Sequence, residues 1–276
     1  MCYHSCKKND KEEQPAPQEP QLIFKFKFDP TQERLDNFGN TSTIPSGNAA
    51  QSPTFHAIGA NYIELAPNAN TALGNGFKVY NGPSTTEGGA QAIDFDKEKN
   101  VAEGEVFYSM PIKNATPGNY KWLRVSLAYQ NYDVKFRVSS LDLTGRLASF
   151  VGYNTYINSF KVKDSLVTVN DDKLQGYWAF ETAYNVIKGQ APQTTVPNPI
   201  NSTSPIPAGS CVVTGNFEQD LTITGNETKD VVVTISLSTN KSFEWKDDNS
   251  NGIWEPTAGE LVVDMGLRGL KPSYTK

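Results

Sequence analysis

Histidine, cysteine and long apolar runs are scarce in this sequence. It contains only two histidines, His4 and His56, so no cluster of histidine and cysteine with the spacing of a zinc or copper site can be written. A catalytic Ser-His-Asp or Cys-His arrangement also has little support, because only His56 could serve as the base. No phosphate-binding G-x-x-x-x-G-K or G-x-G-x-x-G motif occurs, and no G-x-S-x-G turn. The sequence therefore does not indicate a nucleotide-dependent, zinc-dependent or serine-dependent enzyme.

Charge and hydrophobicity exclude two further classes of protein. The 25 basic and 30 acidic residues are mixed along the chain and give a net charge of −5, so no basic stripe could neutralise a nucleic-acid backbone. The longest apolar runs are only a few residues, whereas a membrane-spanning helix needs roughly 20. Three cysteines cannot all pair within one chain, so a disulfide framework is not indicated, and we expect Cys211 to be a buried small hydrophobe.

The first 20 residues are polar, charged and proline-rich, which predicts a disordered tether over residues 1–20. Within them Ser5-Cys6-Lys7-Lys8, followed by an acidic stretch, resembles the mature start of bacterial lipoproteins, especially the surface lipoproteins of the Bacteroidota. The resemblance implies that Cys6 is acylated and holds the protein on the outer membrane, outside the cytoplasm. Only five residues precede Cys6, without an apolar signal segment. Either that segment has been removed, or the true start differs, or Cys6 is not acylated.

Alternating apolar residues predict an all-β fold. In Leu22–Phe28 the leucine and the phenylalanines fall on one face and the lysines on the other, which is the pattern of a half-buried strand. The same period of two recurs in Trp122–Leu127 and in Asp133–Val138. Because convincing helices are scarce and turn-forming residues are frequent, we expect an antiparallel β-sandwich with long loops. We expect a single domain over residues 21–276, with a proline-rich surface excursion at residues 189–209.

Two segments are less easily assigned. Leu221–Thr224 and Val231–Leu237 both alternate, and between them lie Gly225 and Asn226, which tolerate positive φ, so we interpret the pair as a hairpin. Residues 177–188 place apolar side chains at helical spacing and equally well in alternation. Periodicity alone leaves both a helix and a strand open for this segment.

Residues 247–260, DDNSNGIWEPTAGE, contain a motif with metal-ligand spacing. Asp247, Asn249 and Asn251 alternate and are followed by glycine, as at positions 1, 3, 5 and 6 of an EF-hand loop. Position 12 would be Ala258, so the bidentate carboxylate that an EF-hand requires is missing, and both flanks look like strands. A switch built on paired helices is therefore not expected.

The same stretch resembles the D-x-N-x-N-G calcium loops of secreted bacterial proteins, which lack EF-hand helices. The resemblance implies a structural calcium site, since Ca²⁺ takes roughly six to eight oxygen ligands and such a turn supplies several of them. The candidate ligands, in which Ile253 contributes its carbonyl and one of the last three residues completes the shell, are Asp247, Asn249, Asn251, Ile253, Glu255, Glu260 and Asp264. The alternative is a turn whose Asn and Asp side chains only satisfy turn geometry.

Carboxylates and tryptophans are the remaining candidates. Two carboxylates brought together by the fold could hydrolyse a polysaccharide, although 30 acidic residues make chance pairs common. The carboxylates near apolar runs are Glu64, Asp94, Glu105, Glu181 and Glu244. Tryptophan rings could form a sugar-binding surface, but in a β-sandwich they lie more often in the core or at its rim. The four tryptophans are Trp122, Trp178, Trp245 and Trp254.

Several short elements, taken in order, resemble the MbnP-like lipoprotein and periplasmic domains that are associated with copper handling. The matching stretches include Phe24–Phe28, Asn61–Leu65, Ile93–Phe95 and Ala115–Tyr120. The resemblance implies a secreted β-sandwich, with copper bound by some members of the family. Two histidines and three methionines are few ligands for copper in this chain.

These features together predict a secreted or surface-anchored binding protein with a structural calcium loop. Its expected ligand is a glycan, a peptide or a partner protein. The first alternative is a hydrolase that acts on polysaccharide through an acidic pair, and the second is an MbnP-like copper-handling protein. The prediction of binding comes from the compartment and the fold class, because no catalytic machinery is visible in the sequence.

Overall fold

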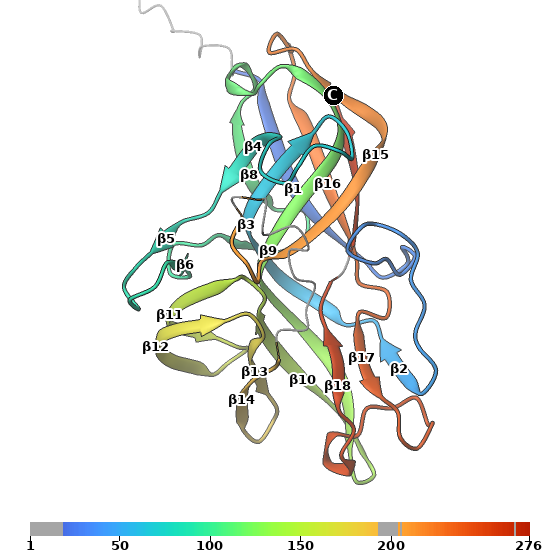
Figure 1. The fold of residues 1–276 in the computed structure, drawn as a ribbon. Coiled ribbons are helices and arrows are strands. Elements are labelled where there is room, and N and C mark those ends of the chain that lie inside the picture. The colour runs from blue at the N-terminus through green and yellow to red at the C-terminus, as the bar shows by residue number, and fades with distance from the viewer. Residues whose placement is uncertain (1–18, 193–203, 205, 268) are drawn as a thin grey trace, which may run out of the picture.

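The computed structural model describes residues 19–192, 204, 206–267 and 269–276, and this part of the chain is almost entirely β (Figure 1). Its helical segments are two single turns of 3-10 helix, η1 (Ile112–Asn114) and η2 (Pro256–Ala258). None of the helical segments in these ranges is long and apolar enough to cross a membrane. The predicted all-β architecture is confirmed.

The strands form four sheets. The first contains, in spatial order, β19 (Leu270–Thr275), β16 (Val231–Ser238), β1 (Gln21–Asp29) and β8 (Val106–Pro111). The second sheet has eight strands. Six of them lie in the order β14 (Val186–Gln190), β13 (Tyr177–Glu181), β10 (Leu141–Phe150), β9 (Gly118–Val138), β3 (Thr54–Ala66) and β4 (Phe77–Asn81). The other two are β15 (Cys211–Ile223), which pairs with β9, and β7 (Asn100–Val101), which pairs with β3. The third contains β12 (Leu166–Leu174), β11 (Asn154–Lys161), β6 (Ala92–Asp94) and β5 (Ser84–Thr85). The fourth contains β18 (Val262–Met265), β17 (Phe243–Lys246) and β2 (Asn48–Gln51).

The alternation in Leu22–Phe28 correctly predicted strand β1. Its leucine and three phenylalanines are buried, and the lysines between them point outward. The pairing was less predictable from this pattern, because β1 lies parallel to β16 and antiparallel to β8. The other parallel pair in the described part of the chain joins β6 and β11, and the remaining pairs are antiparallel.

The long strand β9 connects the two halves of the molecule. The two predicted strands Trp122–Leu127 and Asp133–Val138 are parts of this one strand of 21 residues. β15 pairs with its first half and β10 with its second half, while β3 runs along its other edge. In Figure 1, β9 accordingly extends from the upper half of the molecule into the lower half.

The predicted hairpin between Leu221–Thr224 and Val231–Leu237 is wrong. The first segment belongs to β15, which pairs with β9, and the second belongs to β16, which pairs with β1 and β19. The chain between them does bend, and there the Glu227 carboxylate accepts hydrogen bonds from the backbone N–H groups of Thr224 and Gly225. The chain thus changes direction at Gly225, whose φ is 80°, but the two strands pair in different sheets.

The ambiguous segment 177–188 is a hairpin of β13 and β14, so the strand alternative is correct. On β13, Tyr177 and Ala179 face the third sheet, while Phe180 faces the fourth. Both faces of the β9–β10–β13 region are thus apolar. The third sheet covers one face, and the fourth sheet, whose strands have four residues each, lies against the other.

Some of the sequence predictions lie outside the described residues. Cys6 and most of the tether over residues 1–20 are among these, as is the middle of the proline-rich excursion at residues 189–209. Cys211, by contrast, is described, and it is a buried free cysteine at the start of β15, as predicted. Burial and the charge of Asp264 raise the pKa of the Cys211 thiol to about 12, so this side chain behaves as a small hydrophobe.

Candidate functional site

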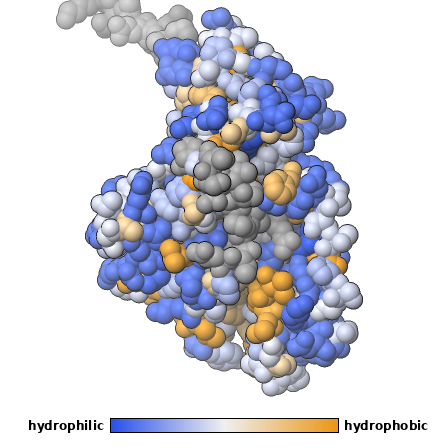
Figure 2. All heavy atoms as spheres, viewed as in Figure 1, coloured by the Kyte–Doolittle hydropathy of each residue, from blue (hydrophilic) through white to orange (hydrophobic). Residues whose placement is uncertain are grey.

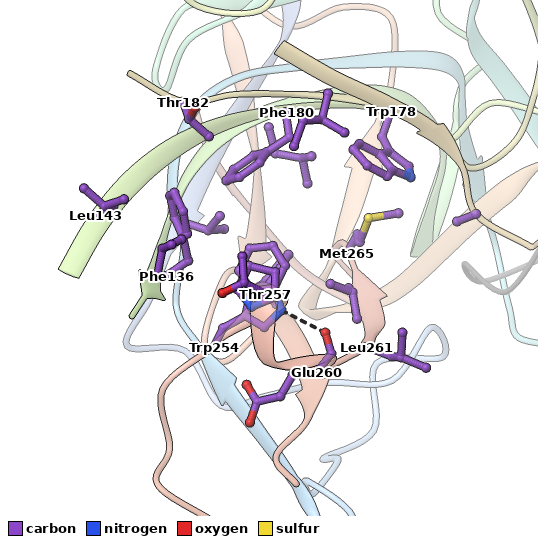
Figure 3. Close-up of a pocket in the computed structure, with 18 of the residues that line it drawn as sticks. Phe136, Leu143, Trp178, Phe180, Thr182, Trp254, Thr257, Glu260, Leu261 and Met265 are labelled. Atoms are coloured by element: carbon purple, nitrogen blue, oxygen red, sulfur yellow. Dashed lines mark hydrogen bonds between the residues drawn. The ribbon is translucent and has the colours of Figure 1, made fainter. Parts of the chain in front are cut away.

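A large apolar cavity lies between the β9–β10–β13 face and the fourth sheet. Its volume is about 1040 Å³, and its lining comes from β9, β10, β13, β14, β17, η2 and β18 and from the loops beside them. Figure 3 shows Phe136, Phe180, Trp178 and Met265 around it, with Trp254 at its base. The cavity exists because the alternating residues of β9 and β13 present an apolar face that the short strands of the fourth sheet cover only in part.

Aromatic rings pack closely at the base of the cavity. The ring of Trp254 is buried, and its centroid lies 4.8 Å from that of Phe243, 5.8 Å from that of Phe180 and 6.1 Å from that of Phe136. The indole Nε1 donates a hydrogen bond of 3.4 Å to the Glu260 carbonyl, which Figure 3 marks with a dashed line. Trp254 is therefore held in place by both its ring and its polar atom.

The rim of the cavity is unusually apolar for a protein surface. Nine large apolar side chains are exposed in the described part of the chain, and five of them line this cavity. These five are Leu141, Tyr184, Ile187, Leu261 and Val263. In the space-filling view, apolar residues gather on the lower half of the molecule, where β18 lies in Figure 1 (Figure 2). Apolar surface concentrated in this way is typical of a binding site.

The predicted calcium loop, residues 247–260, connects β17 to β18, which pair with each other antiparallel. Asp247 accepts hydrogen bonds from the backbone N–H groups of Asn251 and Gly252, at 3.1 and 2.9 Å. Asn249 Oδ1 accepts from Asn251 N, and Asn251 Oδ1 accepts from Ile253 N. Gly252 has a φ of 71°, which a residue with a side chain rarely adopts. The backbone thus wraps tightly around the three side chains that the spacing singled out.

Two of the three acids proposed to complete the shell lie in this loop. Glu255 Oε2 accepts hydrogen bonds from the side-chain amides of Asn249 and Asn251, at 2.6 and 2.7 Å. Glu260 Oε2 accepts one of 2.7 Å from the backbone N–H of Glu255. Asp264 lies apart on β18, where its Oδ1 accepts from Gly266 N. Six of the seven candidate ligand residues thus lie in the loop between β17 and β18, and Asp264 lies outside it.

One carboxylate oxygen of this loop is unsatisfied. Glu260 is only 4% exposed, and its Oε1 has no hydrogen-bond partner among the described residues. No group of three or more His, Cys, Asp or Glu side chains with metal-binding geometry occurs in those residues. A bound ion would therefore depend on amide and carbonyl oxygens as well as carboxylates, and oxygen donors of this mixed kind suit calcium.

The carboxylates considered for hydrolysis are each occupied by other partners. Glu64 pairs with Arg124, Asp94 with Lys97, and Glu244 with Arg34. Glu105 accepts from Ala102 N. Glu181 accepts from the backbone N–H groups of residues 163–165; burial opposes ionisation, but these hydrogen bonds lower its pKa. None of the five lines the cavity, so the hydrolase alternative gains no support from this geometry.

The four tryptophans and His56 have different environments. Trp178 and Trp254 line the cavity, whereas Trp245 is 1% exposed within the core and Trp122 is half-buried elsewhere on β9. His56 Nε2 lies 2.8 Å from an Asp133 carboxylate oxygen, so the one described histidine already has a partner. Two tryptophans therefore remain as candidate ligand-binding residues.

Sequence reasoning missed the cavity itself. Its lining includes Phe136, Leu143, Phe180 and Met265, none of which was predicted as a site residue. Tyr184 belonged to the apolar pattern over residues 177–188, whereas in the structure it lies exposed between β13 and β14 at the rim of the cavity. The width of the gap between two sheets is not encoded in any such local pattern.

Comparisons with known proteins do not indicate a function, so any functional proposal depends on the geometry of the site. No protein-family model, no curated protein sequence and no solved structure matches this chain.

Proposed function

We propose that this chain is a secreted or surface-anchored binding protein that takes an apolar ligand, such as the acyl chain of a lipid, into the cavity beside β18. The cavity carries the proposal: it is large, lined by aromatic and aliphatic side chains, and surrounded by exposed apolar residues. Its volume of about 1040 Å³ lies at the upper end of the range found for small-molecule sites. Apolar surface buried by a ligand would contribute roughly 25 cal/mol per Å².

The lining favours an acyl chain over a glycan. A sugar needs hydrogen-bond partners for each hydroxyl group that it buries, because an unpaired buried polar group is costly. The cavity offers few polar side chains, of which Thr182, Asn185 and Thr257 are the clearest. Trp178 and Trp254 could stack on a sugar ring, but the polar groups that would orient it are sparse.

The same proposal includes a location and a structural ion. Attachment to the outer membrane through an acylated Cys6 is supported by the lipoprotein-like sequence around that residue. A structural calcium ion in the 247–260 loop is supported by the ring of Asp and Asn side chains and by the unsatisfied Glu260 oxygen. Copper handling has no comparable support from the described side chains.

Binding of an uncharged apolar fluorophore, N-phenylnaphthylamine, tests the cavity. Leu141→Asp places a charge on the rim at a side chain that is already 58% exposed, so the fold should tolerate it. Because the ligand would have to desolvate this carboxylate, we expect its affinity to fall by about tenfold or more, which corresponds to roughly 1.4 kcal/mol. Fluorescence titration measures the affinity.

Leu166→Asp is the matched control, because Leu166 is 67% exposed on β12, outside the cavity. This variant should bind the fluorophore as the unchanged protein does. Monolaurin, an uncharged lipid, should displace the fluorophore, and maltotetraose should not. Equal loss of affinity in both variants, or displacement by the sugar alone, would contradict the proposal.

Calcium should stabilise the folded chain. A ligand that binds only the native state raises the free energy of unfolding by RT ln(1 + [L]/Kd), which is roughly 2.7 kcal/mol at a calcium concentration of about 100 Kd. Thermal unfolding with excess calcium and with chelator measures this gain. Asp247→Ala should abolish it, whereas Asp248→Ala, which removes a neighbouring exposed carboxylate, should retain it. Identical melting curves for the unchanged protein in both conditions would rule out the calcium site.

A further inference from the structure

The 247–260 loop and the apolar cavity share the same residues. Trp254, Pro256, Thr257 and Glu260 belong to the loop and also line the cavity. We infer that calcium binding in the loop controls the affinity of the cavity for its apolar ligand. This inference rests on the proposed function, and it assigns the ion a regulatory role in addition to a structural one.

Glu260 connects the two sites directly. Its carboxylate holds the loop through Glu255 N, and its backbone carbonyl accepts the hydrogen bond from Trp254 Nε1. In Figure 3 the carboxylate points away from the aromatic side chains of the cavity, while the carbonyl points toward Trp254. One residue therefore touches the ion site with its side chain and the cavity wall with its backbone.

The loop has two ways to satisfy its polar groups. In the structure, the Glu255 carboxylate accepts hydrogen bonds from the amide nitrogens of Asn249 and Asn251. A calcium ion would attract that carboxylate and would require amide oxygens, not nitrogens, to face it. Calcium would also supply the partner that Glu260 Oε1 lacks. Binding would therefore rearrange the Glu255 side chain and add a contact to Glu260 Oε1.

Trp254 would transmit this rearrangement. It precedes Glu255 in the chain, and its backbone carbonyl accepts a 2.8 Å hydrogen bond from Arg137 N on β9. Its ring packs on Phe136, Phe180 and Phe243 at the base of the cavity. A shift of the residues that follow it would change the position of the ring, because close-packed aromatic contacts leave little free space.

Coupling of this kind must be reciprocal. If calcium tightens binding of the apolar ligand by a certain factor, the ligand tightens calcium binding by the same factor. Such factors are typically about 5- to 150-fold. We therefore expect calcium to lower the Kd of N-phenylnaphthylamine by at least about fivefold, and saturating fluorophore to lower the Kd of calcium equally.

The experiment is a fluorescence titration of the full chain with N-phenylnaphthylamine, in excess calcium and in chelator, with magnesium as a control for ionic strength. The fluorophore is uncharged, so calcium does not bind it directly. Glu260→Gln should bind the fluorophore with the same affinity in both conditions. Asp248→Asn removes one charge from the same loop without touching the proposed ligands, and it should keep the full calcium effect. Glu255→Gln provides an independent variant if Glu260→Gln does not fold.

Each outcome distinguishes the coupling from the proposed function. Equal fluorophore affinity with and without calcium, together with a calcium-dependent rise in melting temperature, would overturn the coupling and leave the binding function in place. No calcium effect on either melting or binding would also overturn it. No fluorophore binding in any condition would overturn the proposed function and the coupling together. A calcium effect that survives in both Glu260→Gln and Glu255→Gln would show that the coupling does not run through this loop.

Discussion

Replacing Glu64 by alanine should lower the free energy of unfolding by about 3 to 5 kcal/mol, which is the usual cost of removing one partner from a buried ion pair. The Glu64 side chain is fully buried on β3, and its Oε1 lies 3.6 Å from Arg124 Nη1 on β9. Its carboxylate also accepts hydrogen bonds from the Tyr62 hydroxyl and from the backbone N–H groups of Gly74 and Gly76. Alanine would leave all of these donors, and the buried Arg124 charge, without their acceptor.

Chemical denaturation of the variant measures this loss. Glu218→Ala removes an exposed carboxylate from β15 and should change the stability by no more than about 0.5 kcal/mol. A loss below about 1 kcal/mol for Glu64→Ala would show that Glu64 is not the structural carboxylate that its contacts indicate. Glu64 was considered as a hydrolase residue because it lies near an apolar run, and the structure shows instead why a carboxylate is needed there: it ties β3, β9 and the turn before β4 together.

Local patterns predicted local structure well. The alternation at Leu22–Phe28 placed β1 within one residue at each end, and the flanks of the 247–260 loop are strands, as expected. Both results depend only on the two-residue period of a strand, which any sheet imposes. The ring of side chains at Asp247, Asn249 and Asn251 was equally predictable, because Asx-type hydrogen bonds act over a few residues.

Long-range pairing could not be predicted in the same way. The hairpin assigned around Gly225 failed because a turn motif does not determine which sheet each strand joins. The sequence predicted two separate strands within β9 because the buried apolar residues lie at odd-numbered positions in the first segment, such as Leu123, and at even-numbered positions in the second, such as Phe136. The physical reason is that β9 leaves one core and enters another, so its central residues are buried on both faces.

A buried carboxyl outside the candidate site was also invisible in the sequence. Glu98 lies between β6 and β7 and is only 8% exposed, and neither of its carboxyl oxygens has a hydrogen-bond partner in the described part of the chain. Asn100 Oδ1 is unpartnered as well. A Cβ on Gly59 would lie 2.2 Å from Asn100 Oδ1 and 2.9 Å from Glu98 Oε1. Both acceptor oxygens therefore lie next to Gly59, and they leave no room there for a side chain. Burial raises the pKa of Glu98 to about 8, and the carboxyl is therefore protonated at neutral pH.

Replacing Glu98 by glutamine should consequently stabilise the protein at pH 8 by up to about 4 kcal/mol, and should change little at pH 4. In the unfolded chain this carboxyl ionises near its ordinary pKa of 4.5, whereas in the folded chain it ionises near 8. Between these values the unfolded state holds fewer protons, so the unchanged protein loses stability as the pH rises, by about 1.4 kcal/mol per pH unit. Glutamine has a similar shape and no charge to desolvate.

The measurement is the difference in unfolding free energy between Glu98→Gln and the unchanged protein across this pH range. The other titrating groups, including His56 with Asp133, contribute equally to the pH dependence of both proteins, so their contributions cancel in the difference. The burial of Tyr80 and Tyr129, whose pKa values are raised to about 12 partly by the charge of Glu98, keeps both hydroxyls protonated throughout. Glu218→Gln, at an exposed position, should give a flat difference. A flat difference for Glu98→Gln as well would mean that Glu98 ionises alike in the folded and unfolded chains, and that water or a cation reaches the pocket beside Gly59.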